Sequence, residues 1–205
     1  MRVRKIFPNI QSAHIVRNCT SERCSHSVHG HSTTVELIFE SKDLDNAQMV
    51  MDFGLMKGAI KEFIDSMDHC YLLCNKDKAD FCKFIKSECA RYIEMPFNPS
   101  AEMLSVWIFA TIEHIINKTM FNNGESAPHL VEVIYHETAS GSAECSREDY
   151  EHLWCNKYKL DDIEFSDGVV KDWNDMTKSV IDRKYSYKSE PGMIVNPEVI
   201  QQIKL

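Results

Sequence analysis

Alternation of apolar and polar positions predicts four strands. In the stretch after His29, Val35, Leu37 and Phe39 alternate with polar residues, as in a strand with one buried face. Residues 131–135 repeat this alternation and lead to Glu137. Residues 5–16 are interpreted as an earlier strand, and residues 141–145 begin a fourth.

Apolar residues recur every three or four positions in two other stretches, which predicts two amphipathic helices. The first covers residues 53–67, with Asp52 as its N-cap. The second is predicted to begin with Asn98 as the cap and Pro99 at the first helical position. Its broad apolar face extends over residues 103–116.

The predicted order is strand, strand, helix, helix, strand, strand, which favours an α+β fold with helices on one face of an antiparallel sheet. Residues 70–95 fit a helix or a strand, and residues 17–28 have the polar composition of a loop. Residues 150–205 are polar and weakly periodic. We therefore expect a domain of residues 1–149 and a C-terminal extension of residues 150–205.

Charge and apolar content exclude two broad classes of protein. The 205 residues include 23 Lys+Arg and 31 Asp+Glu, a net charge of −8, whereas general nucleic-acid binders need a basic face. The longest apolar stretch, residues 103–116, contains Glu113 and is shorter than the roughly 20 residues of a membrane span. No apolar signal segment follows the basic N-terminus, so a cytoplasmic protein is expected.

The strongest chemical signal is His29-Gly30-His31 at the head of a predicted strand. Residues i and i+2 of a strand point to the same face about 7 Å apart, so both imidazoles can reach one metal ion. A catalytic zinc site needs a third ligand and an open position. His14 supplies the third ligand if the first two strands pair, and His26 is a competing ligand. The alternative is that these histidines bind nothing.

Three further features have both a chemical and a structural interpretation. Cys24 precedes the histidines and would be a reactive thiolate near a metal, although Cys19 is a rival and a buried thiol is the simpler explanation. Asp68-His69 has the form of an orienting acid–base pair or of two surface residues. Glu137 ends a strand on its apolar face, where a carboxylate needs a partner unless the strand end is solvated.

Taken together, these segments resemble the family of 6-pyruvoyltetrahydropterin and 6-carboxytetrahydropterin synthases. The matching segments cover about residues 5–147 and are, in chain order, SAH at 12–14, Cys24 with HGH at 29–31, MVMDFGLMK at 49–57, MDH at 67–69, NPSAE at 98–102 and HET at 136–138. The resemblance implies the tunnelling fold, in which subunits join edge to edge into a homohexamer with active sites between subunits.

The resemblance also implies a role for each matching residue. His14, His29 and His31 correspond to the Zn2+ ligands, and Cys24 with the Asp68-His69 pair corresponds to the catalytic groups. Glu137 corresponds to the carboxylate that anchors the pterin ring. The implied substrate is 7,8-dihydroneopterin triphosphate, cleaved to 6-carboxytetrahydropterin, acetaldehyde and triphosphate on the route to queuosine.

The sequence departs from the family pattern in places, and two other functions stay open. Ile15 follows the first metal histidine where the family often has Arg, so Arg17, Arg23 and Lys57 are the candidates for the triphosphate. Ser100 replaces a Thr. A 6-pyruvoyltetrahydropterin synthase would share the same site, and a zinc-containing pterin-binding protein without turnover would need only the anchor. The compact loop of Cys24 favours the carboxypterin enzyme.

Overall fold

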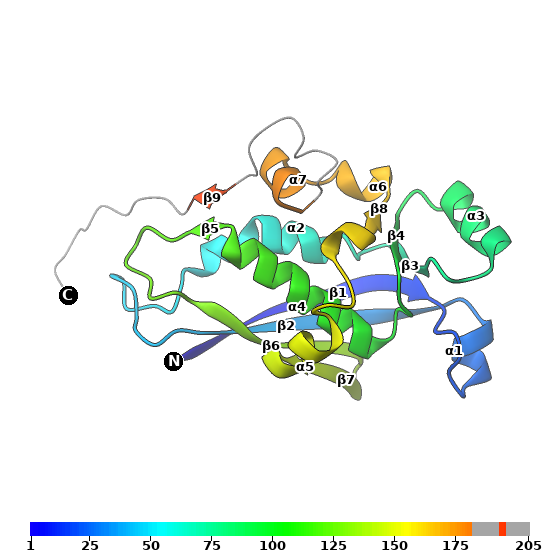
Figure 1. Ribbon diagram of the computed structural model, residues 1–205, viewed down its shortest axis with the longest axis horizontal. Helices are drawn as coiled ribbons and strands as arrows, with labels where there is room; N and C mark the ends of the chain where they lie inside the picture. The colour runs from blue at the N-terminus through cyan, green and yellow to red at the C-terminus, as the bar shows by residue number, and fades with distance from the viewer. Residues whose placement is uncertain (182–192, 196–205) are drawn as a thin grey trace.

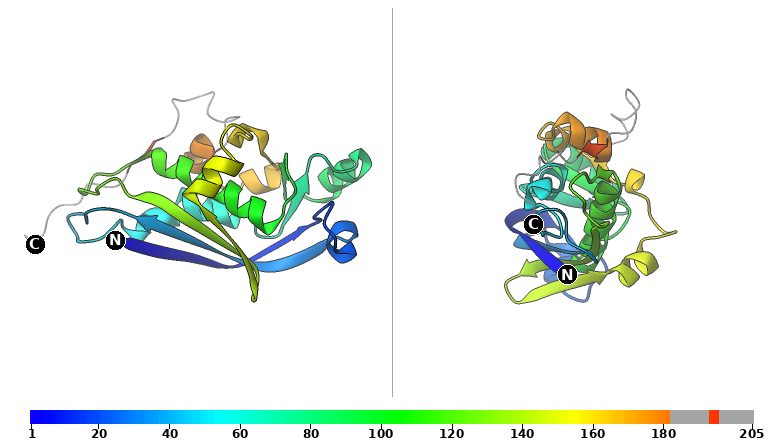
Figure 2. Two further views of the ribbon diagram at one scale, coloured as in Figure 1. Left: turned by 60° about the horizontal axis from the view of Figure 1, so that its bottom comes forward. Right: turned by 90° about the vertical axis from the view of Figure 1, so that its left-hand side faces the viewer.

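The computed structural model describes residues 1–181 and 193–195. These residues form a curved sheet with helices on one face (Figures 1 and 2). The elements in chain order are β1 (Arg2–His14), α1 (Glu22–His26), β2 (His29–Glu40), the 3-10 helix η1 (Phe53–Lys57), α2 (Ala59–Asp65), β3 (Cys70–Cys74), α3 (Ala79–Glu88), β4 (Tyr92–Met95), α4 (Ala101–Asn117), β5 (Thr119–Met120), β6 (His129–Thr138), β7 (Gly141–Ser146), α5 (Arg147–Leu153), the 3-10 helix η2 (Leu160–Asp162), β8 (Glu164–Phe165), α6 (Asp167–Val170), α7 (Asp175–Ile181) and β9 (Ile194–Val195).

The main sheet has seven strands in the order β7-β6-β2-β1-β3-β4-β8. The pairs among β7, β6, β2 and β1 are antiparallel, as predicted. The segment 70–95, whose sequence fits a helix or a strand, contains both: helix α3 lies in the chain between strands β3 and β4. Strand β3 pairs in parallel with β1 and with β4. The α+β prediction is therefore confirmed, with a parallel addition beside β1.

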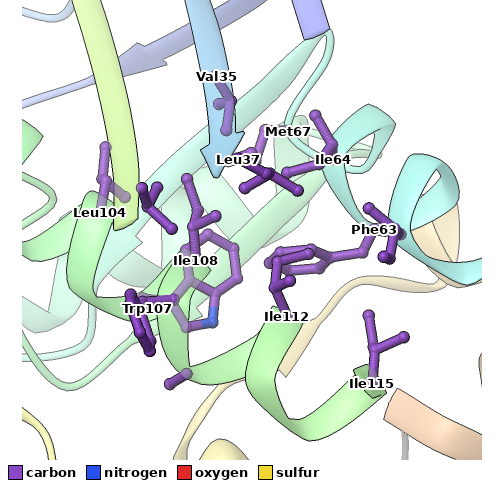
Figure 3. Packing of buried hydrophobic residues seen from close by; sticks show 14 of the residues in the cluster. Val35, Leu37, Phe63, Ile64, Met67, Leu104, Trp107, Ile108, Ile112 and Ile115 are labelled. Atoms are coloured by element: carbon purple, nitrogen blue, oxygen red, sulfur yellow. The ribbon is translucent and has the colours of Figure 1, made fainter. Parts of the chain in front are cut away.

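The core lies between the sheet and helices α2 and α4 (Figure 3). Val35 and Leu37 on β2 are fully buried against this layer, because alternate residues of a strand share a face. Phe63 on α2 and Trp107 on α4 meet edge to face with ring centroids 5.1 Å apart. The predicted helices thus supply the apolar side chains that cover one face of the sheet.

Two helix starts differ from the sequence prediction. The predicted helix 53–67 is divided at Gly58 into η1 and α2, although the Asp52 carboxylate caps η1 through the Gly54 N–H as expected. The prediction that Asn98 caps the next helix is wrong, because Ser100 is the N-cap of α4 and accepts from the Met103 N–H. The Asn98 side chain instead binds the backbone of Arg17.

Strand β1 contains a β-bulge that changes which side chains face the core. The β1–β2 pairing shifts by one residue between Phe7 and Ile10, and Asn9 has a φ of 64°. Phe7 is buried before the bulge, whereas Ile10 and His14 are buried after it. Beyond the bulge, it is therefore the even-numbered residues of β1 that face the helices.

The described part of the C-terminal extension packs on the core of the preceding residues. Trp154, Val169 and Trp173 are buried within the main apolar cluster, and β8 pairs with β4 at the end of the sheet. Helices α6 and α7 lie beside α2 on the side away from the sheet (Figure 1). Among the described residues, no helix combines the length and apolar character of a membrane span. Residues 182–192 and 196–205 of the extension lie outside the described residues.

Candidate active site

Strand pairing brings three histidines together at one end of β1 and β2. His14 lies opposite His29, and Ser12 lies opposite His31, so all three imidazoles are on the core side of the two strands. One nitrogen from each ring lies within 4.8 Å of the other two. A Cβ at Gly30 would be 3.1 Å from the Ser12 carbonyl oxygen, so glycine permits this close approach of the strands.

Backbone carbonyls set the tautomers of two of these rings. The Nδ1 of His14 lies 2.7 Å from the Pro99 oxygen, and the Nδ1 of His29 lies 3.0 Å from the Ser27 oxygen. A carbonyl oxygen only accepts, so each Nδ1 carries the proton and each neutral ring has its lone pair on Nε2. This is the arrangement in which histidines bind metals.

The Nε2 atoms of His14 and His29 face each other at 3.1 Å. Burial lowers the pKa of His14 to about 4, against the effect of the Pro99 bond and together with the charges of its neighbours. The ring is therefore neutral at pH 7, and two opposed lone pairs are unfavourable without a cation between them. The buried His31 Nε2 has no hydrogen-bond partner among the described residues. These three donors fit a metal ion with an open coordination position.

Glu137 lies beside the histidine cluster. It is close to the end of β6, on the same face as the buried Val133 and Tyr135. Its Oε1 is 3.7 Å from the His14 Nε2 and 3.8 Å from the His31 Nε2, distances that are too long for hydrogen bonds. The carboxylate therefore lies beside the cluster without a hydrogen bond to it, and Glu137 and His31 both line a pocket of about 620 Å³.

The consecutive residues Asn98, Pro99 and Ser100 lie next to His14 and help to hold it in place. The Asn98 side chain accepts from the Arg17 N–H at 3.0 Å and donates to the Arg17 carbonyl oxygen, which fixes the chain just after His14. The Pro99 carbonyl oxygen accepts a hydrogen bond from the His14 Nδ1–H, and Ser100 is the N-cap of α4. The sequence prediction missed this support, because it assigned Asn98 as a helix cap. The NPSAE segment at 98–102 was the signal that could have indicated it.

Asp68 and His69 form the expected pair at the entry to β3. The Asp68 Oδ2 lies 2.8 Å from the His69 Nδ1, and its Oδ1 accepts from the Gln11 N–H at 2.8 Å. Partial burial opposes ionisation, but the Gln11 bond, His69 and the charge of Arg91 together hold the pKa of Asp68 below its ordinary value. The His69 side chain is 77% exposed, so its Nε2 is accessible.

The structure does not place Cys24 or the Asp68-His69 pair in the histidine cluster. Cys24 is half-buried in α1, where its carbonyl oxygen accepts from the Val16 N–H at 3.0 Å. His69 lines a pocket of about 670 Å³ whose wall also includes Gln11 and His31. His26, the competing ligand, is exposed and contacts the Ser25 hydroxyl instead.

The three triphosphate candidates have different surroundings. Arg17 is engaged within the protein, where it binds the Asp77 carboxylate at 2.9 Å and the Ser25 carbonyl oxygen at 2.7 Å. Arg23 and Lys57 are exposed. All eight cysteines lie in the described part of the chain and are free thiols.

Three histidines that could hold one metal ion, on an antiparallel sheet and beside a carboxylate, define the class as an α+β protein with a candidate metal site. The sequence model of the 6-pyruvoyl tetrahydropterin synthase family matches residues 4–148. The chain belongs to this family.

Named relatives agree with this assignment, and solved structures share the fold. Two 6-carboxy-5,6,7,8-tetrahydropterin synthases from Helicobacter pylori strains are 36% and 34% identical over 176 and 191 residues, covering 85% and 91% of this chain and 88% and 95% of theirs. A Wolinella succinogenes protein described as uncharacterized shares the fold with a TM-score of 0.59 at 18% identity, over 72% of this chain and 98% of its own. Plasmodium vivax 6-pyruvoyltetrahydropterin synthase gives 0.50 at 14% identity over the same shares.

Proposed function

We propose that this protein is a zinc-dependent 6-carboxy-5,6,7,8-tetrahydropterin synthase. It would convert 7,8-dihydroneopterin triphosphate and water to 6-carboxytetrahydropterin, acetaldehyde and triphosphate. The observation that carries the proposal is the cluster of His14, His29 and His31 with Glu137 at 3.7 and 3.8 Å from two of the ligand atoms. The names of the two Helicobacter relatives, which match most of the chain, favour this reaction over others in the family.

The three histidines would hold Zn2+ through Nε2. When bound, zinc supplies a Lewis acid with an open position, which lowers the pKa of a substrate hydroxyl. Glu137 would accept hydrogen bonds from the 2-amino group and N3 of the pterin, because its two oxygens match two adjacent N–H donors. This anchor fixes the side chain of the substrate next to the histidines.

Cys24 and the Asp68-His69 pair would transfer the protons. Asp68 holds the His69 Nδ1, which leaves the exposed Nε2 to take up or donate a proton. Cys24 would act as a thiolate base. Within one chain the pair lies outside the histidine cluster, and this separation favours an active site completed by a second copy of the chain, as in the homohexamer that we propose.

The remaining parts of the proposal concern the cellular setting. The partners would be the pterin substrate and further copies of the chain, without nucleic acid or membrane. The pathway would be queuosine biosynthesis in the cytoplasm. The domain of residues 1–149 would carry the reaction, with residues 150–205 as an addition to it.

Mass analysis of the products tests the proposal directly. The zinc-loaded protein is incubated with 7,8-dihydroneopterin triphosphate beside two variants, Cys24→Ala and its loop neighbour Cys19→Ala. We expect carboxytetrahydropterin and acetaldehyde from the wild type and from Cys19→Ala, and no turnover with full zinc from Cys24→Ala. A pyruvoyl product would assign the related synthase activity instead. Bound zinc and pterin without any product would indicate a binding protein.

A further inference from the structure

One guanidinium holds the turn that presents the Asp68-His69 pair. Arg91, which lies just before β4, donates from Nε to the Asp68 carbonyl oxygen at 3.1 Å. Its Nη2 lies 3.4 Å and 3.3 Å from the carbonyl oxygens of Asp65 and Ser66. Asp65 is the last residue of α2 and Ser66 is its C-cap, and the Asp65 oxygen also accepts from the Asp68 N–H at 3.0 Å.

The same guanidinium binds the C-terminal extension. Its Nη1 donates to the Gly168 carbonyl oxygen at 2.8 Å and pairs with the Asp172 carboxylate. Because the donors of an arginine side chain lie in one rigid plane, movement of Gly168 or Asp172 is passed on to the Asp68 carbonyl. The extension and the acid–base turn are thus joined through a single side chain.

Two more contacts join the extension to α2. The buried Trp173 donates from Nε1 to the Ser66 hydroxyl at 2.7 Å. Asn174 binds both carboxylate oxygens of Glu62, through its N–H at 2.9 Å and its Nδ2 at 2.7 Å. The extension therefore binds α2 at Glu62 and at its C-cap Ser66, which is followed by Met67 and then Asp68.

The extension is built closely into this region. A Cβ on Gly168 would lie 2.0 Å from the Ala90 carbonyl oxygen, so only glycine allows this approach. Ser166 accepts on its hydroxyl from the Tyr92 N–H at 3.0 Å and donates that hydroxyl to the Ala90 oxygen at 3.0 Å. Arg91 lies between Ala90 and Tyr92, which both bind Ser166, so the extension fixes the backbone on either side of Arg91.

The acid–base turn needs such support. His69 has a φ of 51°, in the left-handed region that costs a non-glycine residue free energy and persists only where the surroundings enforce it. Its N–H donates to the Gln11 carbonyl oxygen at 2.6 Å. Arg91 holds the peptide on the other side, at the Asp68 carbonyl oxygen.

We propose that residues 163–174 of the extension position the acid–base pair through Arg91, which makes Arg91 a positioning residue for the reaction. The inference rests on the proposed function, since it needs His69 to transfer protons. Small misplacements of a reacting group reduce turnover far more than binding, by roughly 10- to 100-fold. We call the contacts of Arg91 with the Asp68 carbonyl oxygen, Gly168 and Asp172 the clamp. Loss of the clamp should therefore lower kcat while leaving KM unchanged.

Arg91→Lys is the decisive variant, because it keeps the charge but cannot reach the separate carbonyls at once. Trp173→Phe tests the extension side by removing the bond to Ser66. Arg147→Lys is the matched control: Arg147 also makes several contacts, to Glu113 at 2.9 Å and to the Leu130 carbonyl oxygen at 2.7 Å, but none with the turn.

We expect Arg91→Lys to lower kcat roughly 10- to 100-fold, with KM within about twofold and full zinc, and to alter the pH profile of kcat. Trp173→Phe should show a smaller loss, and Arg147→Lys none. An unchanged kcat in Arg91→Lys, or an equal loss in Arg147→Lys, would overturn the proposal.

Amide hydrogen exchange of residues 62–72 gives a readout that needs no substrate. Exchange there should accelerate in Arg91→Lys and stay at the wild-type rate in Arg147→Lys. If the wild type fails to convert the pterin, the proposed function fails, but faster exchange would still establish the clamp. Unchanged exchange in Arg91→Lys would refute it whatever the activity.

Discussion

Asn98→Ala tests whether residues 98–100, which contact His14 and Arg17, stabilise both the fold and the candidate metal centre. The Asn98 side chain makes two hydrogen bonds to the backbone of Arg17, one as acceptor at 3.0 Å and one as donor. Each such bond contributes about 0.5–1.5 kcal/mol net, and a buried group left without its partner costs about 1–3 kcal/mol. Truncation leaves the Arg17 N–H and carbonyl without these partners, so we expect a loss of about 2–3 kcal/mol in the free energy of unfolding.

Thermal unfolding measures this loss, which corresponds to a decrease in Tm of roughly 4–12 °C for a chain of this size. Asn98→Asp is the graded control, because it keeps the acceptor for the Arg17 N–H and removes the donor. It should lose less than Asn98→Ala. Zinc affinity should fall roughly 10-fold or more in the alanine variant, since Pro99 orients His14. An unchanged Tm in Asn98→Ala would refute the reasoning.

Three further predictions concern the metal, the packing of the extension and the response to acid. His29→Ala should lose bound zinc and activity together, and a normal metal content by mass spectrometry would contradict the ligand assignment. Gly168→Ala should destabilise the protein by about 1–3 kcal/mol, because its Cβ would meet the Ala90 oxygen at 2.0 Å, whereas Gly58→Ala, with no heavy atom within 4 Å, should cost less in the same urea titration. The depressed pKa of Asp68 means that this carboxylate stabilises the fold above the ordinary carboxyl range near pH 4 and that its contribution is lost as pH falls through the lower native pKa. Stability should therefore fall more steeply in acid for the wild type than for Asp68→Asn, and parallel curves would disprove this assignment.

The sequence was most informative where one face of an element is buried. Val35, Leu37 and Phe39 are all fully buried on one side of β2, so alternation alone identified the strand. His14 was predicted to approach His29 and His31 if the first two strands pair; they do pair, and His14 lies opposite His29. Local spacing is sufficient for such features because they depend on one element and its nearest partner.

Other features depend on contacts between distant segments, which spacing does not encode. Trp173 is buried and binds Ser66, 107 positions away, from a short stretch between two helices without helical periodicity of its own. Asn98 is a residue type that commonly caps helices, but its side chain instead binds the backbone of Arg17, just after β1. The parallel pairing of β3 with β1 could not be predicted either, because nothing in the sequence of residues 70–74 indicates the strand with which they pair.

The bulge in β1 means that the candidate metal centre depends on how β1 pairs as well as on residue identity. Up to Phe7 the odd-numbered side chains face the helices, and from Ile10 the even-numbered ones do. If the same residues paired without the bulge, the register of Phe7 with Val35 would place His14 opposite Val28 instead of His29 and turn it to the opposite face, away from His29 and His31. Such a chain would still contain every histidine of the motif, and a comparison that counts residues alone would classify it as intact. The bulge is therefore as necessary for the histidine cluster as the histidines themselves.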